Sequence, residues 1–404
     1  MTPSILPAPA GRPIAVLSWG LGVDSTAILL RWILDPTSRE FDLDDLVVLV
    51  AQTGDEWPIT GELAEQYVFP LLRRHKIRLV QLARTARTKE AAGGCNYTVL
   101  DDTRSPTRCY IEGLYKLSDE MFHSGTVPQT GGKRLCSVHA KGELLDWWVG
   151  AYTQGRPYTH AVGFELGELS RRDQDLRKSK LPGRQALYPL IDWGWWREDA
   201  YDYLLRHLGV AYEKSACQMC PYALTSAKGR GRTIPRYLAA PHLAMLPLLM
   251  EHTAVALNER QGLIGGKRLA DELRRHPDAG PLLALFAEHL DAQQWAVYDV
   301  RRAFVQGKDG RAASARSLEV VELGSQKDVR AHLDLIAEKH GRSVERDGIH
   351  RRLRLLNRQP TLPTAERSLV LSPATAEPKV APAFPKMWET GLAGAAISQE
   401  ELVL

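Results

Sequence analysis

A short segment near the N-terminus constrains the fold most strongly. Residues 15–30 read AVLSWGLGVDSTAILL, an apolar stretch that enters a glycine turn and continues into a helix-like stretch. Backbone N–H groups at the start of a helix attract anions, so we expect this turn to hold a negatively charged group. The turn is not a Walker A loop, because Asp24 stands where that motif requires lysine. It also lacks the third glycine of a dinucleotide-binding fingerprint.

Alternating strand-like and helix-like segments surround this turn. The apolar runs predict buried strands at residues 13–19, 46–53, 77–84 and 158–164, and helices at 61–75, 141–152 and 197–208. This alternation indicates βαβ units and a parallel sheet, which is an α/β fold. The long stretch 85–133 is polar and without periodicity, which predicts an insertion or a mobile loop.

The second half of the chain has a different composition. Residues 227–236 read as a linker, and apolar helical periodicity dominates from Tyr237 to Phe304 before a strand-like and a helix-like segment at 317–323 and 326–341. From residue 359 on, Pro, Ala and Thr predict an extended tail. We therefore expect three parts: a nucleotide-binding domain 1–230, a mainly helical accessory region 231–358 and the tail 359–404.

The composition and the apolar pattern predict neither a membrane-spanning nor a secreted protein. Charged residues make up 25% of the chain and apolar residues 44%, which is ordinary for a globular protein. No apolar run reaches the roughly 18 residues that a membrane span requires. The N-terminus lacks the basic start and apolar stretch of a signal peptide. We expect a cytoplasmic protein with no membrane partner, and the net charge of +4 is too small to indicate nucleic-acid binding by itself.

The glycine turn resembles a known phosphate-binding loop. The segment from Gly20 to Ser25 is similar to the SGGxDS pyrophosphate-binding (PP) loop of the adenine nucleotide α-hydrolase family. Gly22 would let the backbone approach a phosphate, while the amides that open the helix and the hydroxyls of Ser25 and Thr26 would donate to its oxygens. The family loop begins with serine where this chain has Gly20, and Ser18 is the candidate substitute. The alternative is an ordinary strand–turn–helix corner.

Four further segments extend the resemblance over residues 14–222, to the phosphoadenosine phosphosulfate (PAPS) reductase branch of that family. They are a T-G-x-x-x-P turn after the second strand, an R-x-C-x-x-x-x-K segment, a loose G-x-x-x-x-E-S-x-x-R match, and a P-L-x-D-W helix followed by C-x-x-C-P. In chain order, the residues that carry these four matches are Thr53, Gly54, Pro58, Arg134, Cys136, Lys141, Gly163, Glu168, Arg171, Arg172, Cys217 and Cys220.

The resemblance implies a site for ATP and Mg²⁺. Asp24, Arg134 and Lys141 are the expected catalytic residues. The expected nucleotide-binding residues are Ser18, Gly20, Gly22, Asp24, Ser25, Thr26, Asp55, Gly163, Arg171 and Arg172. The acids Asp24, Asp55 and Glu56 follow predicted strands, where ligands of open sheets bind, and one of them is expected to hold Mg²⁺ through oxygen.

Three cysteines suggest a metal centre. Cys136, Cys217 and Cys220 coincide with positions that carry iron–sulfur ligands in cluster-containing members of the branch. A [4Fe–4S] cluster normally takes four thiolates, so the fourth ligand would be Cys109, Cys95, a non-protein group, or absent. Zinc in a Cys₃His set with His139 is the alternative. A redox-active or merely packed CxxC pair is a third interpretation.

The expected activity is cleavage of ATP to AMP and pyrophosphate, coupled to sulfur transfer. Reductases of this branch use a cysteine near the C-terminus as nucleophile, and this chain has none after Cys220. The expected partners are a nucleotide substrate, a sulfur donor protein and a nucleic-acid acceptor, the last suggested by basic stretches at 229–236 and 350–358; leucines in the second stretch indicate a partly buried helix. The alternatives are a PAPS or adenylyl sulfate reductase that uses an external thiol, and a catalytically weak nucleotide-binding subunit.

Overall fold

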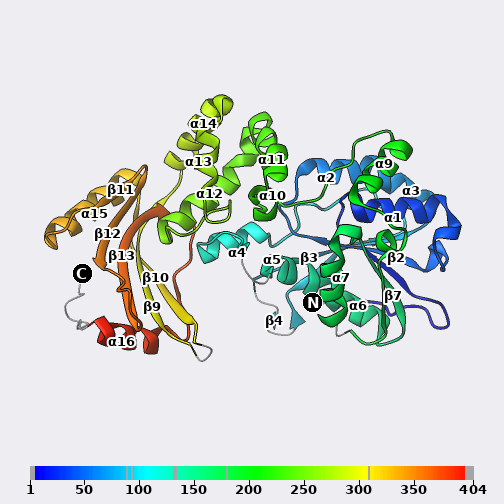
Figure 1. Cartoon of the computed structure of the whole chain (residues 1–404), viewed down its shortest axis with the longest axis horizontal. Coiled ribbons are helices and arrows are strands. Elements are labelled where there is room, and N and C mark those ends of the chain that lie inside the picture. The colour runs from blue at the N-terminus through cyan, green and yellow to red at the C-terminus, as the bar shows by residue number, and fades with distance from the viewer. Residues whose placement is uncertain are drawn as a thin grey trace. The chain divides into compact units, whose positions relative to one another are not determined.

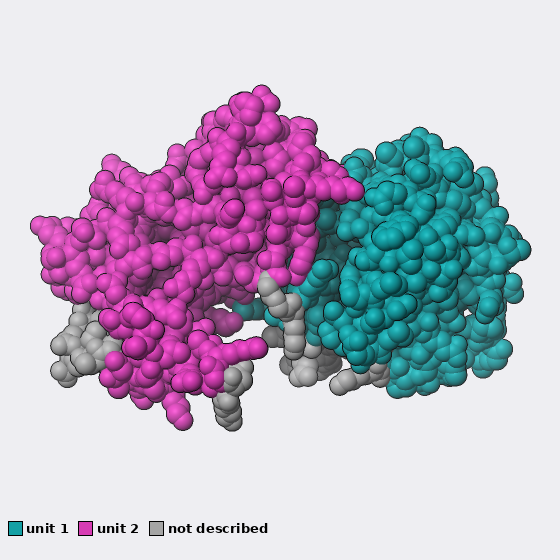
Figure 2. Space-filling view, viewed as in Figure 1, with its two compact units in different colours: residues 1–120, 131–218 teal, residues 121–130, 219–404 magenta. Residues whose placement is uncertain are grey.

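The chain divides into two compact units. The computed structural model describes residues 5–87, 90–91, 94–130, 134–178, 181–307 and 310–395. The first unit comprises residues 1–120 and 131–218, and the second comprises residues 121–130 and 219–404 (Figure 2). The predicted domain boundary at residue 230 is therefore displaced, and part of the expected insertion belongs to the second unit.

A six-stranded sheet forms the centre of the first unit. Its strands follow the order β6-β3-β2-β1-β7-β8, with bounds β1 (Ala15–Ser18), β2 (Leu46–Gln52), β3 (Arg78–Arg84), β6 (Tyr97–Thr103), β7 (Tyr158–Val162) and β8 (Arg184–Leu187). All neighbours pair in parallel except β6, which runs antiparallel to β3. The predicted α/β class is confirmed, with a mixed sheet whose core is parallel.

Helices cover this sheet (Figure 1). They are α1 (Val23–Leu34), α2 (Pro58–Leu63), α3 (Phe69–Arg74), α5 (Leu135–Ser137), α6 (Glu143–Thr153), α7 (Leu169–Lys178), α8 (Pro189–Asp192) and α9 (Arg197–Leu208); α4 (Leu117–Ser124) crosses the boundary between the units. The helix predicted over 61–75 is interrupted by a π-helical turn at Ala64–Val68. Pro70 follows that turn and cannot donate a backbone hydrogen bond to the preceding turn of helix.

Both faces of the sheet are buried, which explains why its strands read as continuous apolar runs. Ala15 and Leu17 belong to a core cluster shared with α1 and α9. Val16, between them, belongs to a second cluster that includes Trp148 of α6. Successive side chains of a strand point to opposite faces, so β1 is packed on both sides and its C-terminal end is held rigidly.

The stretch predicted as a loop, residues 85–133, contains regular structure. Besides β6 and α4, it includes the short strands β4 (Glu90–Ala91) and β5 (Gly94–Cys95). β6 is an edge strand whose polar side chains include Asp102, which accepts two hydrogen bonds of 2.7 Å from Arg78. Edge strands lack the apolar signal of central strands, so this prediction was wrong for β6. Residues 88–89, 92–93 and 131–133 lie outside the described ranges.

The second unit contains an antiparallel sheet beside its helices, which the sequence did not lead us to expect. Its strand order is β11-β12-β13-β9-β10-β14, with bounds β9 (Trp295–Gln306), β10 (Ala312–Gly324), β11 (Glu345–Asp347), β12 (His350–Leu356), β13 (Thr364–Pro373) and β14 (Lys379–Val380). The helical prediction fails over 295–304, where β9 is buried on both faces and therefore shows no strict alternation of apolar and polar residues.

The helices of the second unit are α10 (Pro221–Thr225), α11 (Ala227–Ala239), α12 (Pro241–Leu257), α13 (Leu269–Arg274), α14 (Gly280–Asp291), α15 (Gln326–Lys339) and α16 (Phe384–Ala395). Two predictions are corrected here. The expected linker at 227–236 is α11, begun by Ser226, whose side chain accepts a hydrogen bond from the Gly229 amide. The expected extended tail contains β13, β14 and α16, and α16 packs Phe384 and Trp388 against Ala303 and Ala365. None of the helices in the described part of the chain is long and apolar enough to span a membrane.

Candidate functional site

The candidate site lies where the strand order of the first sheet reverses. β1 is central, with β2 and then β3 on one side and β7 and then β8 on the other. In open α/β sheets, ligands bind outside the carboxyl ends of the strands at this reversal. The glycine turn, residues 20–22, leaves the end of β1 at this point, and Gly163 follows β7.

Two glycines are needed near the turn, Gly22 within it and Gly163 after β7, because other backbone segments approach them closely. A Cβ atom on Gly22 would lie 2.7 Å from the Ser215 amide nitrogen, and one on Gly163 would lie 3.0 Å from the Ser25 amide nitrogen. Leu21 between the two turn glycines has a φ of 60°, a left-handed conformation that is uncommon for this residue type. The β1 and β7 ends are thus brought together at the first turn of α1.

Hydroxyl groups line this corner with defined roles. The Gly20 amide donates a 3.1 Å hydrogen bond to Ser25 Oγ, which ties the turn to the helix. Trp19 Nε1 donates to Thr26 Oγ1 at 2.9 Å, and Thr26 is only 1% exposed. Thr26 therefore faces the core, whereas the sequence led us to expect it at the ligand.

Ser18 is fixed by a histidine of the neighbouring strand. Arg184 Nε donates to His160 Nδ1 at 2.8 Å, so the ring proton of a neutral His160 sits on Nε2 and is donated to Ser18 Oγ, 2.8 Å away. Burial, with the charge of Arg184, lowers the pKa of His160 to about 4. His160 is therefore neutral near pH 7 and orients Ser18 without acting as its base.

A cluster of opposite charges gathers at the N-terminus of α1. Arg197, from the start of α9, lies 3.1 Å from an Asp24 carboxylate oxygen, 3.4 Å from Glu168 and 3.6 Å from Glu165. Arg171 pairs with Glu168 in turn. Burial raises the pKa of Asp24, against the opposing effect of Arg197.

Lys214 adds a further cation to this charged cluster. Burial and the neighbouring Arg197 lower the pKa of its amine, and the charges of Asp24 and Glu168 act in the opposite direction. With Lys214, three cationic side chains face three carboxylates. The sequence analysis did not identify Arg197 or Lys214 as site residues.

A second group of polar side chains follows β2. Asp55 is 2% exposed and accepts hydrogen bonds of 2.7 Å from both the amide and the hydroxyl of Ser118. Burial raises the pKa of Asp55 to about 6. Glu56, 5% exposed, accepts a 3.0 Å hydrogen bond from Lys141 Nζ at Oε1, while its buried Oε2 has no hydrogen-bond partner in the described part of the chain.

The segment 213–218 connects the two groups. The Val23 amide donates to the Glu213 carbonyl oxygen at 3.1 Å, and the Gln218 amide donates to the Asp55 carbonyl oxygen at 2.8 Å. Between these contacts, Ser215 touches Gly22 and Cys217 forms an isolated β-bridge with Glu56. One strand-like segment therefore spans the ends of β1 and β2 and forms a wall of the candidate site.

The expected cysteine centre stays a prediction. Among the side chains that the structure describes, no three His, Cys, Asp or Glu residues form a group that could hold a metal ion. Cys136 lies in α5, and Cys217 Sγ lies 3.4 Å from Thr53 Oγ1. Cys220 belongs to the second unit. Burial, with the nearby Glu56 carboxylate, raises the pKa of Cys217 well above its usual value.

The two cysteines named as possible fourth ligands differ. Cys109 is buried in the first core, where Gln52 Nε2 donates to its sulfur at 3.5 Å and burial raises its pKa to about 12. The Cys95 side chain lies outside those described. The predicted iron–sulfur cluster and its zinc alternative therefore stay predictions.

The four cationic residues predicted for the site lie in different surroundings. Arg171 joins the charged cluster and Lys141 pairs with Glu56. Arg172 donates to Asp173 at 2.8 and 2.9 Å instead. Arg134 is exposed, and its carbonyl oxygen accepts hydrogen bonds from the Ser137 and Val138 amides at the start of α5.

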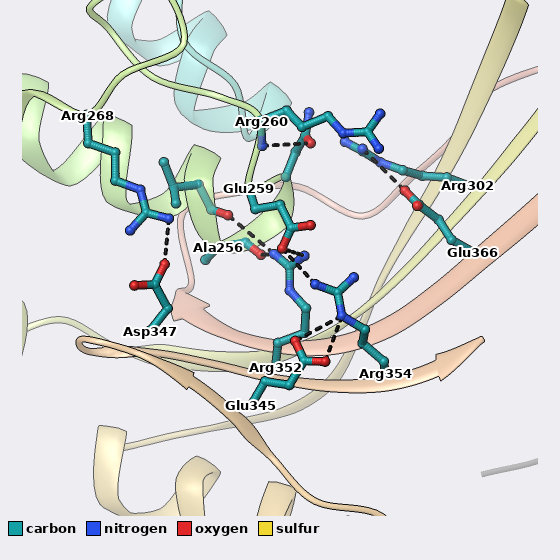
Figure 3. A network of polar contacts seen from close by, with 12 residues as sticks. Ala256, Glu259, Arg260, Arg268, Arg302, Glu345, Asp347, Arg352, Arg354 and Glu366 are labelled. Carbon is teal, nitrogen blue, oxygen red and sulfur yellow. Dashed lines mark hydrogen bonds and ion pairs between the residues drawn. The ribbon is translucent and has the colours of Figure 1, made fainter. Parts of the chain in front are cut away.

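The basic stretch 350–358 of the second unit is largely the strand β12, where a partly buried helix was expected. Leu353 and Leu355 are buried, and the alternating Arg352 and Arg354 both pair with Glu259, at 2.9 and 2.8 Å (Figure 3). Arg354 also lies 2.8 Å from Glu345. These ion pairs balance much of the positive charge that suggested a nucleic-acid partner.

Comparison with known proteins gives no relative from which function can be transferred. No family model matches the chain, and neither a curated protein nor a solved structure matches it. The function must therefore be argued from the geometry of the site.

Proposed function

We propose that the first unit binds ATP by its phosphates at the N-terminus of α1 and cleaves the bond between the α and β phosphates. An acceptor oxygen would attack the α-phosphate, forming an adenylated acceptor and releasing pyrophosphate. A sulfur nucleophile from a donor protein would then displace AMP. The specific PP-loop, PAPS reductase-like fold belongs to this proposal and rests on the five resembling segments.

The position of the glycine turn carries the proposal. Residues 20–22 open α1 next to β7, at the reversal of the strand order. Backbone N–H groups and the helix dipole attract phosphate at such a terminus. Gly22 and Gly163 keep side chains away from the place where the backbones meet. A phosphate chain there needs no lysine of the Walker type.

The charged cluster supplies the counter-charges. Arg171 and Arg197 are held by Asp24, Glu165 and Glu168, and the charges of Asp24 and Glu168 also act on Lys214. Bound phosphates would exchange some of these carboxylates for phosphate oxygens, which pair well with guanidinium groups. Cations at the leaving pyrophosphate stabilise the charge that develops in the transition state.

Mg²⁺ would neutralise charge on the phosphates and needs only one or two protein carboxylates, because it keeps several of its water ligands. Glu56 fits that need, since its Oε2 is buried and lacks a partner among the described residues. Lys141, 3.0 Å from the other oxygen, holds this carboxylate in place. No step of the proposal runs through a cysteine-bound metal.

Equilibrium binding of ATP to variants tests the location of the site. Ser25→Ala removes the hydroxyl that we expect to donate to a phosphate oxygen, together with the 3.1 Å hydrogen bond that ties the Gly20 amide to the helix, and Asp24→Ala removes the carboxylate that positions Arg197. We expect each to weaken ATP binding by about tenfold or more, because a phosphate contact is lost in the first variant and misplaced in the second. Unchanged affinity in both variants would refute the assignment of the loop.

Arg171 and Arg172 offer a matched pair for the same assay. They are adjacent on α7, but Arg171 pairs within the charged cluster and Arg172 pairs with its neighbour Asp173. Arg171→Ala should weaken ATP binding about tenfold, and Arg172→Ala should leave it nearly unchanged. Equal effects of the two substitutions on ATP affinity would indicate that the phosphates do not bind at the charged cluster.

A further inference from the structure

The second unit contains a cavity that the proposed nucleotide site does not use. Its volume is about 270 Å³, and its walls come from α12, α13, Phe286 of α14 and the turn between β11 and β12. His252 and His350 lie in its wall, and we call it the histidine cavity. Because all of its lining residues belong to the second unit, it can be described without reference to the first.

The two histidine rings stack on each other. Their centroids are 4.3 Å apart with an interplanar angle of 18°, and Phe286 lies edge-on to His252 at 6.4 Å. Aromatic faces and the apolar side chains of Leu248 and Val255 thus form part of the wall. Such surfaces favour flat, weakly polar molecules over flexible or strongly hydrated ones.

Each histidine presents a buried nitrogen without a protein partner. His252 is 5% exposed, and neither its Nε2 nor Nδ1 of His350 has a hydrogen-bond partner among the residues described. Nearly all buried polar groups in proteins are hydrogen-bonded, so two unsatisfied nitrogens on residues that line the same cavity indicate a missing partner. A ligand edge with a donor and an acceptor would satisfy both.

The histidine rings are neutral at physiological pH. Burial lowers the pKa of His350 to about 4 and the pKa of His252 well below its usual value; Arg268 and the other histidine add to the second shift. A neutral imidazole offers one donor and one acceptor nitrogen. The cavity therefore recognises hydrogen-bonding groups and not an anion through these rings.

The charged residues of the cavity are already paired. Arg268 lies 2.6 Å from Asp347 (Figure 3), and Arg274 pairs with Asp271. The buried Glu251 carboxylate accepts backbone hydrogen bonds from Leu263, Leu269 and Ala270 at 2.9, 2.7 and 3.1 Å. The two arginines are thus paired with aspartates, and the Glu251 carboxylate is held by backbone amides.

We propose that the histidine cavity binds a neutral, planar nitrogen heterocycle of nucleobase size, hydrogen-bonded through its edge to His252 and His350. The volume lies just below the roughly 300 Å³ at which pockets for larger organic ligands begin, which suits one or two fused rings. This inference goes beyond ATP cleavage and does not depend on it. The heterocycle comes either from a free nucleoside or from an unstacked base of a nucleic-acid strand.

Titration calorimetry with the full chain tests the proposal. The probes are adenosine, guanosine, cytidine and uridine, which lack the phosphates that the proposed ATP site holds, and single-stranded oligonucleotides of the same bases. We expect one nucleoside or base to bind, and His350→Leu to weaken binding about tenfold by removing one hydrogen bond. The side-chain nitrogen resonances of His350 should shift on binding.

A second variant keeps the test valid if His350→Leu impairs folding. Ile349 lines the cavity and is 40% exposed, so Ile349→Trp fills its mouth without altering the core. Leu335→Trp, at a 64% exposed position on α15, is the matched control. The first should abolish binding and the second should preserve it, as should Arg171→Ala in the first unit.

The results of these experiments distinguish the two sources of the heterocycle. Nucleoside binding with this pattern of variants supports a small-molecule site, and binding confined to oligonucleotides with the same pattern supports a base taken from a strand. Absence of binding by every probe overturns the proposal. Binding that both His350→Leu and Ile349→Trp leave unchanged also overturns it.

Discussion

At the level of single residues, Asp55 shows how burial sets charge at the candidate site. An unfolded aspartate loses its proton near pH 3.9, whereas folding raises the pKa of Asp55 to about 6. The folded state therefore binds the proton more tightly, and stability falls as pH rises between these values. Asp55→Asn can keep both contacts with Ser118. We expect the variant to be about 2 kcal/mol more stable than the wild type near neutral pH.

Urea unfolding at a series of pH values checks this prediction. The stability of the wild type should decline between about pH 4 and pH 6 by more than that of Asp55→Asn. A loss of ATP turnover in the stabilised variant would mark Asp55 as a functional residue kept at a cost to stability. Destabilisation of the variant near neutral pH would contradict the argument.

His350 should produce the opposite dependence on pH. Its pKa is lowered to about 4 in the folded chain, whereas an unfolded histidine takes up a proton near pH 6.5. Acid therefore favours the unfolded state over this window, at a cost of about 2 kcal/mol near pH 5. His350→Leu should be less sensitive to acid than the wild type, while a change at the exposed His207 should not alter the sensitivity. Equal acid sensitivity in all three proteins would exclude this role.

Single residues also show the limit of the sequence analysis. Asp24 was predicted to lie at the site because it belongs to the segment that resembles the PP loop. Its partner Arg197 lies 173 positions further along the chain, and Lys214 further still. A local sequence pattern does not show which distant side chains form an ion pair after folding. The sequence did indicate that Arg197 lies at the start of a helix.

At the level of elements, two glycines of the turn provide a direct comparison. A Cβ on Gly22 would lie 2.7 Å from the Ser215 backbone nitrogen, whereas one on Gly20 would only meet Ser215 Oγ at 3.7 Å. Gly22→Ala should therefore cost about 1–3 kcal/mol through overpacking and weaken ATP binding by displacing segment 213–218. Gly20→Ala should fold and bind nearly as the wild type. Thermal unfolding and ATP affinity check both, and equal tolerance of the two changes would contradict this packing.

Elements were predicted well where burial gives a clear pattern. The strands β1, β2, β3 and β7 were predicted within a few residues because each is an apolar run in a parallel sheet. The edge strand β6 and the long strand β9 were missed, for opposite reasons. β6 carries polar residues such as Asp101 and Asp102, and β9 is buried on both faces without alternation.

At the level of the whole molecule, each unit has its own hydrophobic core. Within the second unit, Arg367 on β13 and Asp299 on β9 form a buried pair, with nitrogen–oxygen distances of 2.7 to 3.1 Å. Arg367→Met would leave the buried Asp299 carboxylate with the more distant Arg301, at 3.6 Å, at a cost of about 3 kcal/mol. We expect thermal unfolding of the second unit at lower temperature, while ATP binding below that temperature is unchanged. A parallel loss of ATP affinity would show that the nucleotide site needs the second unit.

The central claim is that the first unit cleaves ATP between its α and β phosphates. The most direct measurement separates the products after the anaerobically purified chain is incubated with Mg²⁺, ATP and PAPS together, with a thiol reductant. AMP and pyrophosphate, formed by the wild type and not by Ser25→Ala, are the predicted result. Adenosine bisphosphate with sulfite would instead identify a reductase, and ADP with phosphate, or no consumed nucleotide, would contradict the account.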